Sequence, residues 1–223
     1  MKKGIASVVL AAALVAYVVL GVLAHAQQWF FFDPPVTRFF QGFRNPVLDG
    51  AMETISYPGY PPQFLGFFGA VVVVLVALKR WIEAAIMAVG LAVVGGVGFV
   101  VKPLVHRFRP PSSEVWVADP WLLKADRYSF TAGHVHTYMV VVGWCVFLAV
   151  TLLPRGSMWR RAVVVAGVAF LVVMGFARFY LGDHWFSDVV GAYLLGTVGL
   201  SLEILGYGWV KRRWPNRVRP AVS

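Results

Sequence analysis

Six long apolar stretches constrain this chain more than any other feature of its sequence. A helix needs roughly 20 mostly apolar residues to cross the hydrocarbon core of a bilayer. Stretches near that length occupy approximately residues 4–23, 63–78, 82–101, 135–153, 162–176 and 189–210. Hydrophobic residues make up 59% of the chain and charged residues only 13%, which is outside the range of water-soluble domains. We therefore expect an all-α polytopic membrane protein with six transmembrane helices, built as a single membrane-embedded domain over residues 1–223.

The N-terminal quarter of the chain raises two questions. The sequence "MKK", an apolar run and "AHA" resembles a secretory signal with its cleavage site. The run is longer than the ~7–15 residues of a typical signal core, so we expect a retained helix. Residues 35–55 mix large apolar side chains with arginines and carboxylates, which is typical of a helix lying at the membrane interface. A loop that covers the bundle is the alternative interpretation of this segment.

The distribution of basic residues predicts the orientation of the chain. If the amino terminus is cytoplasmic, 12 of the 20 lysines and arginines fall in cytoplasmic segments, as the positive-inside rule requires. These are Lys2, Lys3, Lys79, Arg80, Arg155, Arg160, Arg161, Lys211, Arg212, Arg213, Arg217 and Arg219. The net charge of +10 then reflects orientation and anionic lipid, and we expect no nucleic-acid partner. Both termini are predicted to be cytoplasmic, which places the connection 102–134 and the loop after the fifth stretch on the outer face.

Most of the other basic residues lie in those two outer segments. Lys102, Arg109 and Arg178 can together surround an anion that has several oxygens, and the arginine fork suits phosphate. Three cations held close together repel one another unless a polyanion joins them. Arg107 and Lys124, from the same segments, are interpreted as side chains that extend to lipid headgroups.

Two histidines in the same segments have features of catalytic groups. His184 and Asp188 are four residues apart and share a helix face. A carboxylate on one imidazole nitrogen fixes the tautomer and leaves the other nitrogen as a directed nucleophile or base. His134 follows Gly133 at the start of a helix, where free backbone N–H groups favour an anion. There it can give a proton to a leaving oxygen.

A metal site is the alternative use of these side chains. The candidate ligands are His134, His136, His184 and Asp188. The excess of cations beside them argues for an anion and against a divalent ion, so we expect no metal and no cofactor. His106, His136 and Asp183 border the same region, and no step of the chemistry requires them.

Three segments, taken in order, resemble the signature of the type-2 phosphatidic acid phosphatase superfamily, which includes membrane lipid phosphatases and soluble vanadium haloperoxidases. The first family motif, K-x6-R-P, is matched in "KPLVHRFRP". The third, S-R-x5-H-x3-D, is matched at Arg178, His184 and Asp188, and the second, P-S-G-H, survives only as Gly133 and His134. Six spans, with these motifs at helix ends, fit the bacterial membrane branch of the family.

The resemblance implies a two-step phosphoryl transfer without metal. His184 would attack phosphorus and form a phosphohistidine, Asp188 would support it, and His134 would protonate the leaving group and later activate water. The implied phosphate-binding residues are Lys102, Arg109, Arg178 and Gly133. The implied reaction is hydrolysis of a lipid phosphate or an isoprenoid lipid diphosphate at the outer face of a bacterial inner membrane.

Two departures from the family pattern bear on the rate. Ala132 and Ala177 replace family serines. A hydroxyl bond to a charged group is worth ~1.5–3 kcal/mol, so loss of the first is expected to slow turnover by about an order of magnitude or more without abolishing it. Thr131 and Ser129 are the nearby hydroxyls that could substitute. Two alternatives stay open: transfer of the phosphoryl group to another lipid, and a protein that binds or transports anionic lipid with little turnover.

Overall fold

The computed structural model describes residues 3–118 and 127–215, and the regular structure in these ranges is helical. Two strand-like residues, Phe108 and Tyr128, form an isolated bridge. The long helices are α1 (Lys3–Ala26), α4 (Pro61–Ala77), α5 (Trp81–Val105), α7 (Gly133–Leu152), α8 (Met158–Tyr180) and α9 (Phe186–Arg213). The shorter elements are α2 (Asp33–Gln41), α3 (Pro46–Ser56) and the 3-10 turn η1 (Tyr57–Gly59). The predicted all-α class is confirmed.

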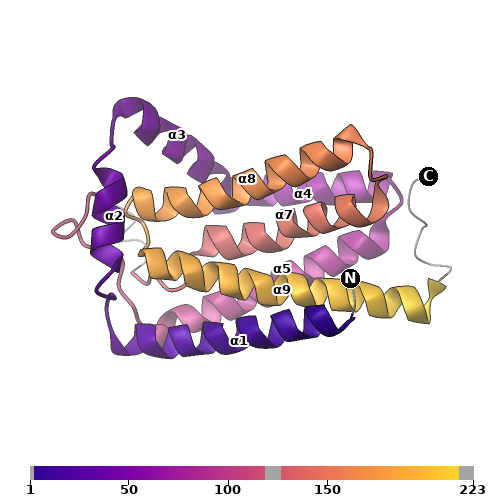
Figure 1. The fold of residues 1–223 in the computed structure, drawn as a ribbon, viewed down its shortest axis with the longest axis horizontal. Helices are drawn as coiled ribbons and strands as arrows, with labels where there is room; N and C mark the ends of the chain where they lie inside the picture. Colours follow the sequence, from indigo (N-terminus) through magenta and orange to yellow (C-terminus); the bar gives the residue numbers. More distant parts are fainter. Residues whose placement is uncertain (1–2, 119–126, 216–223) are drawn as a thin grey trace.

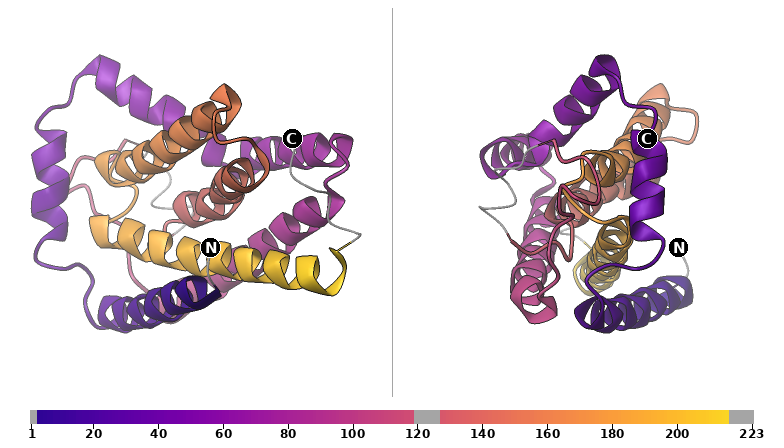
Figure 2. Two further views of the ribbon diagram at one scale, coloured as in Figure 1. Left: turned by 45° about the vertical axis from the view of Figure 1, so that its right-hand side comes forward. Right: turned by 90° about the vertical axis from the view of Figure 1, so that its left-hand side faces the viewer.

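The long helices run alongside one another, and α2 crosses one end of the bundle (Figure 1). α9 packs against α1, α5 and α7, and α7 also packs against α8. Both ends of the described chain lie at the opposite end from α2 (Figure 1). Seen from the α2 end, this short helix joins α1 to α3 across the ends of the others (Figure 2). The last residues of α5 and α8 and the first residues of α7 and α9 therefore meet beneath α2.

Five of the described helices are long and apolar enough to cross a membrane. A sixth span results if α3, η1 and α4, which are bent by 65° at their junction, are counted as one. α4 alone has 17 residues, which explains why the second predicted stretch is short. The fifth stretch gains length from its flanks, because α8 has 23 residues. Large apolar side chains cover the outside of these helices, as at Phe99 (80% exposed) and Val165 (68% exposed), so the chain is a multi-pass membrane protein.

The segment expected to form one interfacial helix contains two. α2 ends at Gln41, and α3 begins after Asn45. The side-chain oxygen of Asn45 accepts hydrogen bonds from the backbone N–H groups of Val47 and Leu48, at 3.1 and 3.0 Å. An asparagine cap followed by proline is a strong signal for a new helix start, and it interrupts the predicted continuous helix here. α2 also covers the bundle, because Phe40 packs on Phe176 and Phe179 of α8. The segment therefore covers the bundle, as the alternative interpretation expected, but as helices and not as a loop. Its position at the membrane interface stays a prediction.

Some predictions concern residues beyond the described ranges. Lys124, which was assigned to lipid headgroups, lies outside the described residues, as do Lys2, Arg217 and Arg219 of the predicted cytoplasmic set. The side on which the termini lie, the retention of the first helix and the single domain over 1–223 stay predictions.

Candidate active site

A tight turn between α8 and α9 positions His184. Gly182 adopts φ +74°, and a Cβ at this position would overlap the carbonyl oxygen of Trp116, so the turn requires glycine. The backbone N–H groups of Asp183 and His184 both donate to the carbonyl of Arg178, at 3.1 and 3.2 Å. The His184 side chain is 1% exposed. Its position is therefore fixed by backbone geometry as well as by packing.

The Nδ1 atom of His184 faces a backbone acceptor. It lies 2.8 Å from the carbonyl oxygen of Ser129 and 3.2 Å from the Ser129 hydroxyl. Its distance to the Asp188 carboxylate is 4.0 Å, too long for a hydrogen bond. A carbonyl can only accept, so Nδ1 carries the hydrogen, and Nε2 keeps its lone pair. The pairing predicted between His184 and Asp188 thus runs through Ser129, whose hydroxyl donates to the Asp188 carboxylate.

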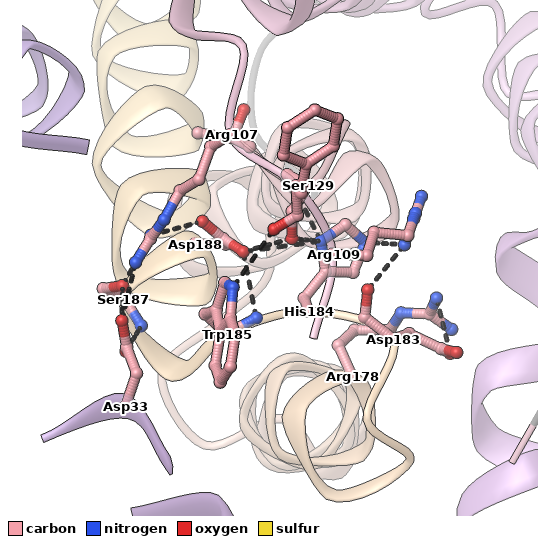
Figure 3. A network of polar contacts seen from close by, with 12 residues as sticks. Asp33, Arg107, Arg109, Ser129, Arg178, Asp183, His184, Trp185, Ser187 and Asp188 are labelled. Atoms are coloured by element: carbon pink, nitrogen blue, oxygen red, sulfur yellow. Dashed lines mark hydrogen bonds and ion pairs between the residues drawn. The ribbon is translucent and has the colours of Figure 1, made fainter. Parts of the chain in front are cut away.

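Asp188 is held from several sides (Figure 3). Its Oδ2 accepts the backbone N–H of Trp185 at 2.9 Å, in addition to the Ser129 hydroxyl. Its Oδ1 accepts Nη1 of Arg107 at 2.7 Å. Neither Asp188 nor Arg107 has any exposed surface. The interpretation of Arg107 as a lipid-facing side chain is therefore wrong, because its guanidinium is the buried partner of this carboxylate.

A second carboxylate completes this network. Asp33, in the first turn of α2, accepts Nη2 of Arg107 at 2.6 Å and both the backbone N–H and the hydroxyl of Ser187, at 2.9 and 2.7 Å. These contacts tie α2 to the first turn of α9 (Figure 3). Arg107 alternates with Arg109 around Phe108, which is 44% exposed. Because residues i and i+2 of an extended segment share a face, this alternation is the signal that could have grouped the two arginines.

The phosphate-binding candidates converge on one side of His184. Arg109 donates from Nη1 to the Asp183 carbonyl at 2.6 Å, and the same atom is 3.2 Å from His184 Nε2. Arg178 forms an ion pair with the Asp183 carboxylate at 2.7 Å and donates to the Ser56 hydroxyl. The sequence indicated no role for Asp183, but it orients both arginines, through its carbonyl and its carboxylate.

These side chains line a pocket of about 390 Å³. Its walls are formed by Gly59, Tyr60, Pro61, Phe64, Leu65, Lys102, Arg109, Gly133, His134, Thr137, Arg178 and His184. Six of the predicted site residues are therefore brought together, and Asp188 lies behind His184. Two polar atoms facing this region, His134 Nε2 and Arg178 Nε, are buried and have no hydrogen-bond partner among the described residues. Buried polar groups are almost always paired, so these two atoms indicate where a polar ligand binds.

The remaining candidates lie outside the pocket walls. Thr131 is buried and lies 3.4 Å from His136 Nδ1, and the Ser129 hydroxyl is used by Asp188. Ala132 stands at the N-cap of α7 without a side-chain bond. Neither Thr131 nor Ser129 therefore supplies a hydroxyl to the pocket in place of the missing family serine.

Electrostatics favour a neutral imidazole at His184 and a bound anion. Burial holds the pKa of His184 well below its ordinary value, and the positive charges of Arg109, Arg178 and Lys102 lower this pKa further. Within the described ranges, no three His, Cys, Asp or Glu side chains are grouped as a metal ion would require. A neutral imidazole whose Nε2 keeps its lone pair, beside three cations, defines the class: a membrane protein whose buried site is suited to phosphate.

Comparison with known proteins agrees with this class. The sequence profile of the PAP2 superfamily matches residues 83–214, more than half of the chain, and the chain belongs to this superfamily. Phosphatidylglycerophosphatase B of Bacillus subtilis (strain 168) is 28% identical over 99 residues, 44% of this chain and 45% of that protein. The undecaprenyl-diphosphatase of Sulfolobus acidocaldarius is 30% identical over 119 residues, 52% of each. The chain spans about half the length of these curated relatives.

Solved structures share the fold over a greater length. The crystal structure of a transmembrane PAP2-type phosphatidylglycerolphosphate phosphatase from Bacillus subtilis matches with a TM-score of 0.73 at 21% identity, covering 91% of this chain and 96% of that chain. The crystal structure of Aquifex aeolicus LpxE matches with a TM-score of 0.61 at 16% identity, covering 80% and 96%. The resemblance to the superfamily is thus confirmed, and the fold extends to the helices that precede the matched profile.

Proposed function

We propose that this protein is a lipid phosphatase that hydrolyses a lipid phosphate or an isoprenoid lipid diphosphate through a phosphohistidine, without a metal. The observation that carries the proposal is the convergence of His184 Nε2 with two unpartnered polar atoms, His134 Nε2 and Arg178 Nε, in and around one pocket. A site that only binds a phosphate group needs cations and no nucleophile. An imidazole whose other nitrogen is fixed by a carbonyl is the arrangement that nucleophilic catalysis needs.

In the first step, the Nε2 lone pair of His184 forms a bond to phosphorus while the bond from phosphorus to the leaving oxygen breaks. His134, protonated on both ring nitrogens, gives its Nε2 proton to that oxygen and becomes neutral, so the leaving group departs as a lipid alcohol, or as a lipid monophosphate from a diphosphate. The Ser129 carbonyl, 2.8 Å from Nδ1, stabilises the positive charge that develops on the imidazole, and Asp188 acts behind it through Ser129.

In the second step, His134 takes a proton from water, and the oxygen of that water displaces Nε2 from phosphorus. Inorganic phosphate leaves and His184 returns to its neutral form. In both steps the transferred group carries negative charge on three oxygens, which Lys102, Arg109 and Arg178 neutralise.

The apolar wall of the pocket indicates how a lipid reaches it. Pro61, Phe64 and Leu65, from the first turns of α4, line the same pocket as the cations. Leu65 is 63% exposed on the outside of the bundle, so this wall continues onto the lipid-facing surface. The hydrophobic anchor of the substrate is therefore placed along α4. The positive-inside rule favours an orientation with this end periplasmic or exterior and both termini cytoplasmic, in a bacterial inner membrane.

The proposal is tested by phosphate release from purified protein in metal-free buffer. A panel of undecaprenyl diphosphate, phosphatidylglycerol phosphate, phosphatidic acid and a lipid A phosphate covers the candidate substrates. We expect release from at least one lipid and its loss in His184→Ala. His106→Asn is the matched control, because His106 has φ +53°, a conformation that asparagine tolerates, and lies outside the pocket walls. Unimpaired release by His184→Ala overturns the mechanism.

One alternative has an observation in its favour. Ala132 removes a hydroxyl that the family places beside the phosphate, which favours a protein that binds anionic lipid with little turnover. That protein would bind the same lipids and release no phosphate from any of them.

A further inference from the structure

A second cavity lies between α5 and α9. Its volume is about 420 Å³, within the range of small-molecule sites. Its walls are formed by Ile82, Ala85, Ile86, Val89, Gly90, Val93, Gly199, Leu202, Glu203, Gly206, Val210 and Trp214. Among these wall residues, Glu203 alone has an ionisable side chain, and the others are apolar or small. The proposed phosphatase mechanism does not use Glu203.

Glu203 is buried without a partner. Its side chain is 2% exposed, and neither carboxylate oxygen has a hydrogen-bond partner among the described residues. A Cβ on Gly90 of α5 would overlap its Oε1, so glycine at that position makes room for the carboxyl. Glu83, equally buried, differs sharply: it accepts from Arg80 at 3.3 Å and from the Tyr207 hydroxyl at 3.4 Å. A buried glutamate in this part of the bundle can therefore have partners, and Glu203 differs from Glu83 in having none among the described residues.

The depth of Glu203 restricts the kind of ligand. It follows Asp188 by 15 residues of α9 and precedes the end of that helix, Arg213, by ten. These separations correspond to roughly 22 and 15 Å of helix, so Glu203 lies near the middle of a hydrocarbon core of about 30 Å. Val89 (64% exposed) and Leu202 (44% exposed) open the cavity to lipid. An unpaired carboxylate is very costly in such surroundings, so the site accommodates the neutral acid.

We propose that this cavity binds a lipid alcohol, whose hydroxyl pairs with Glu203. A neutral carboxyl has one hydrogen to donate and one carbonyl oxygen that needs a donor, and a hydroxyl satisfies both. A ketone or an ether only accepts, an ammonium group only donates, and a charged headgroup stays at the interface. Lipid alcohols are also the products that removal of phosphate from a lipid monophosphate leaves. Only this identification of the ligand as a product class rests on the proposed function.

Labelling with dicyclohexylcarbodiimide, an apolar reagent for protonated carboxyls, tests this site. We expect mass spectrometry to find the reagent on Glu203 and not on the paired Glu83. Hexadecanol at about ten times its Kd should slow this labelling about tenfold, by mass action. Hexadecane and 2-hexadecanone, at the same concentration, should leave the rate within a factor of about two. Absence of labelling, or equal protection by the three compounds, overturns the proposal.

Variants and dilution exclude the other occupants. Binding of radiolabelled hexadecanol should persist in Glu203→Gln, whose amide still donates and accepts, and be lost in Glu203→Met and in Gly90→Ala. If a second copy of the chain fills the cavity, labelling in nanodiscs will instead rise when the number of copies per disc falls, which also overturns the proposal. The His184→Ala protein should label like the unchanged chain, so failure of the phosphatase proposal and failure of this one are observed separately.

Discussion

Two regions of the bundle bury carboxyl groups in opposite ways. At the α2 end, Asp188 receives the Arg107 guanidinium, the Ser129 hydroxyl and the Trp185 N–H, and it has no exposed surface. At depth between α5 and α9, Glu203 is as well buried and receives nothing from the described residues. A satisfied buried charge fixes geometry, and removing its partner is costly. A buried neutral carboxyl without a partner in the protein contributes little to the fold, and the proposed ligand accounts for it at Glu203.

The largest effect is expected from Arg107→Met. This change leaves Asp33 and Asp188 buried without their cation, which costs about 3–5 kcal/mol of stability and misplaces the carboxylate behind His184. The measurement is thermal unfolding in detergent together with phosphate release. Arg38→Met is the matched control, because its pair with Glu114 is exposed (54% and 33%) and worth at most about 1 kcal/mol. Equal stability of the two variants would show that the buried network does not hold the site.

Ala132→Ser should raise the turnover rate. It restores a hydroxyl at the N-cap of α7 beside Gly133 and His134, and a bond to a charged group of about 1.5–3 kcal/mol corresponds to about tenfold or more in rate. Ala149→Ser, a buried position on the same helix, is expected to give no increase. A rate unchanged by Ala132→Ser would mean that the backbone N–H groups already supply what the serine supplies in the family.

The pH dependence of kcat/KM should reveal the charges around His184. A lowered pKa means that the neutral imidazole persists as pH falls, so activity is lost only at pH values well below 6.5. Arg109→Gln removes one of the charges that lower this pKa, so its acid limb should move to higher pH, whereas Arg109→Lys keeps the charge and the limb. Ionisation of the substrate phosphate is common to both variants. Identical acid limbs in the two would exclude His184 as the titrating group.

The smallest effect is expected from Glu203→Met. Replacing an unpartnered polar group by an apolar one is neutral or stabilising, by up to about 1–3 kcal/mol. Glu83→Met should be destabilising instead, because this buried ion pair with Arg80 is lost and the Tyr207 hydroxyl loses its acceptor. Unfolding of both variants in the same detergent provides the comparison. If Glu203→Met is as damaging as Glu83→Met, Glu203 has a structural role.

The sequence predicted the pocket well, because its residues lie in local patterns. Lys102, Arg109, Arg178 and His184 lie in two connections that were predicted on one face of the membrane, and the motifs of the resembled family contain all four. Asp33 was missed because its partners Arg107 and Ser187 are 74 and 154 residues away along the chain, a pairing that leaves no periodic signal. Long-range pairs of this kind depend on how helices meet, which apolar spacing does not specify.

The parts of the fold that depend on local sequence were also predicted, and the parts that depend on how segments join were not. Apolar length alone indicated the membrane helices, since each span is a local property. The bend between α3 and α4 and the break at Asn45 depend on caps and prolines within a segment that was treated as continuous. Asp183 is a single side chain whose role the sequence also did not indicate. Its contact with Arg178 is made in the turn that Gly182 permits, and the sequence order alone does not show it.

The central claim is that His184 becomes covalently phosphorylated during turnover. Its most direct test is rapid acid-free quenching of the metal-free enzyme with a lipid substrate labelled with ³²P in the phosphate that is released, followed by peptide mapping under alkaline conditions that preserve phosphohistidine. The account predicts transient label on the peptide containing His184, within the first turnover and absent from His184→Ala. Phosphate release with no protein-bound label at any time, or label on another residue, would contradict it.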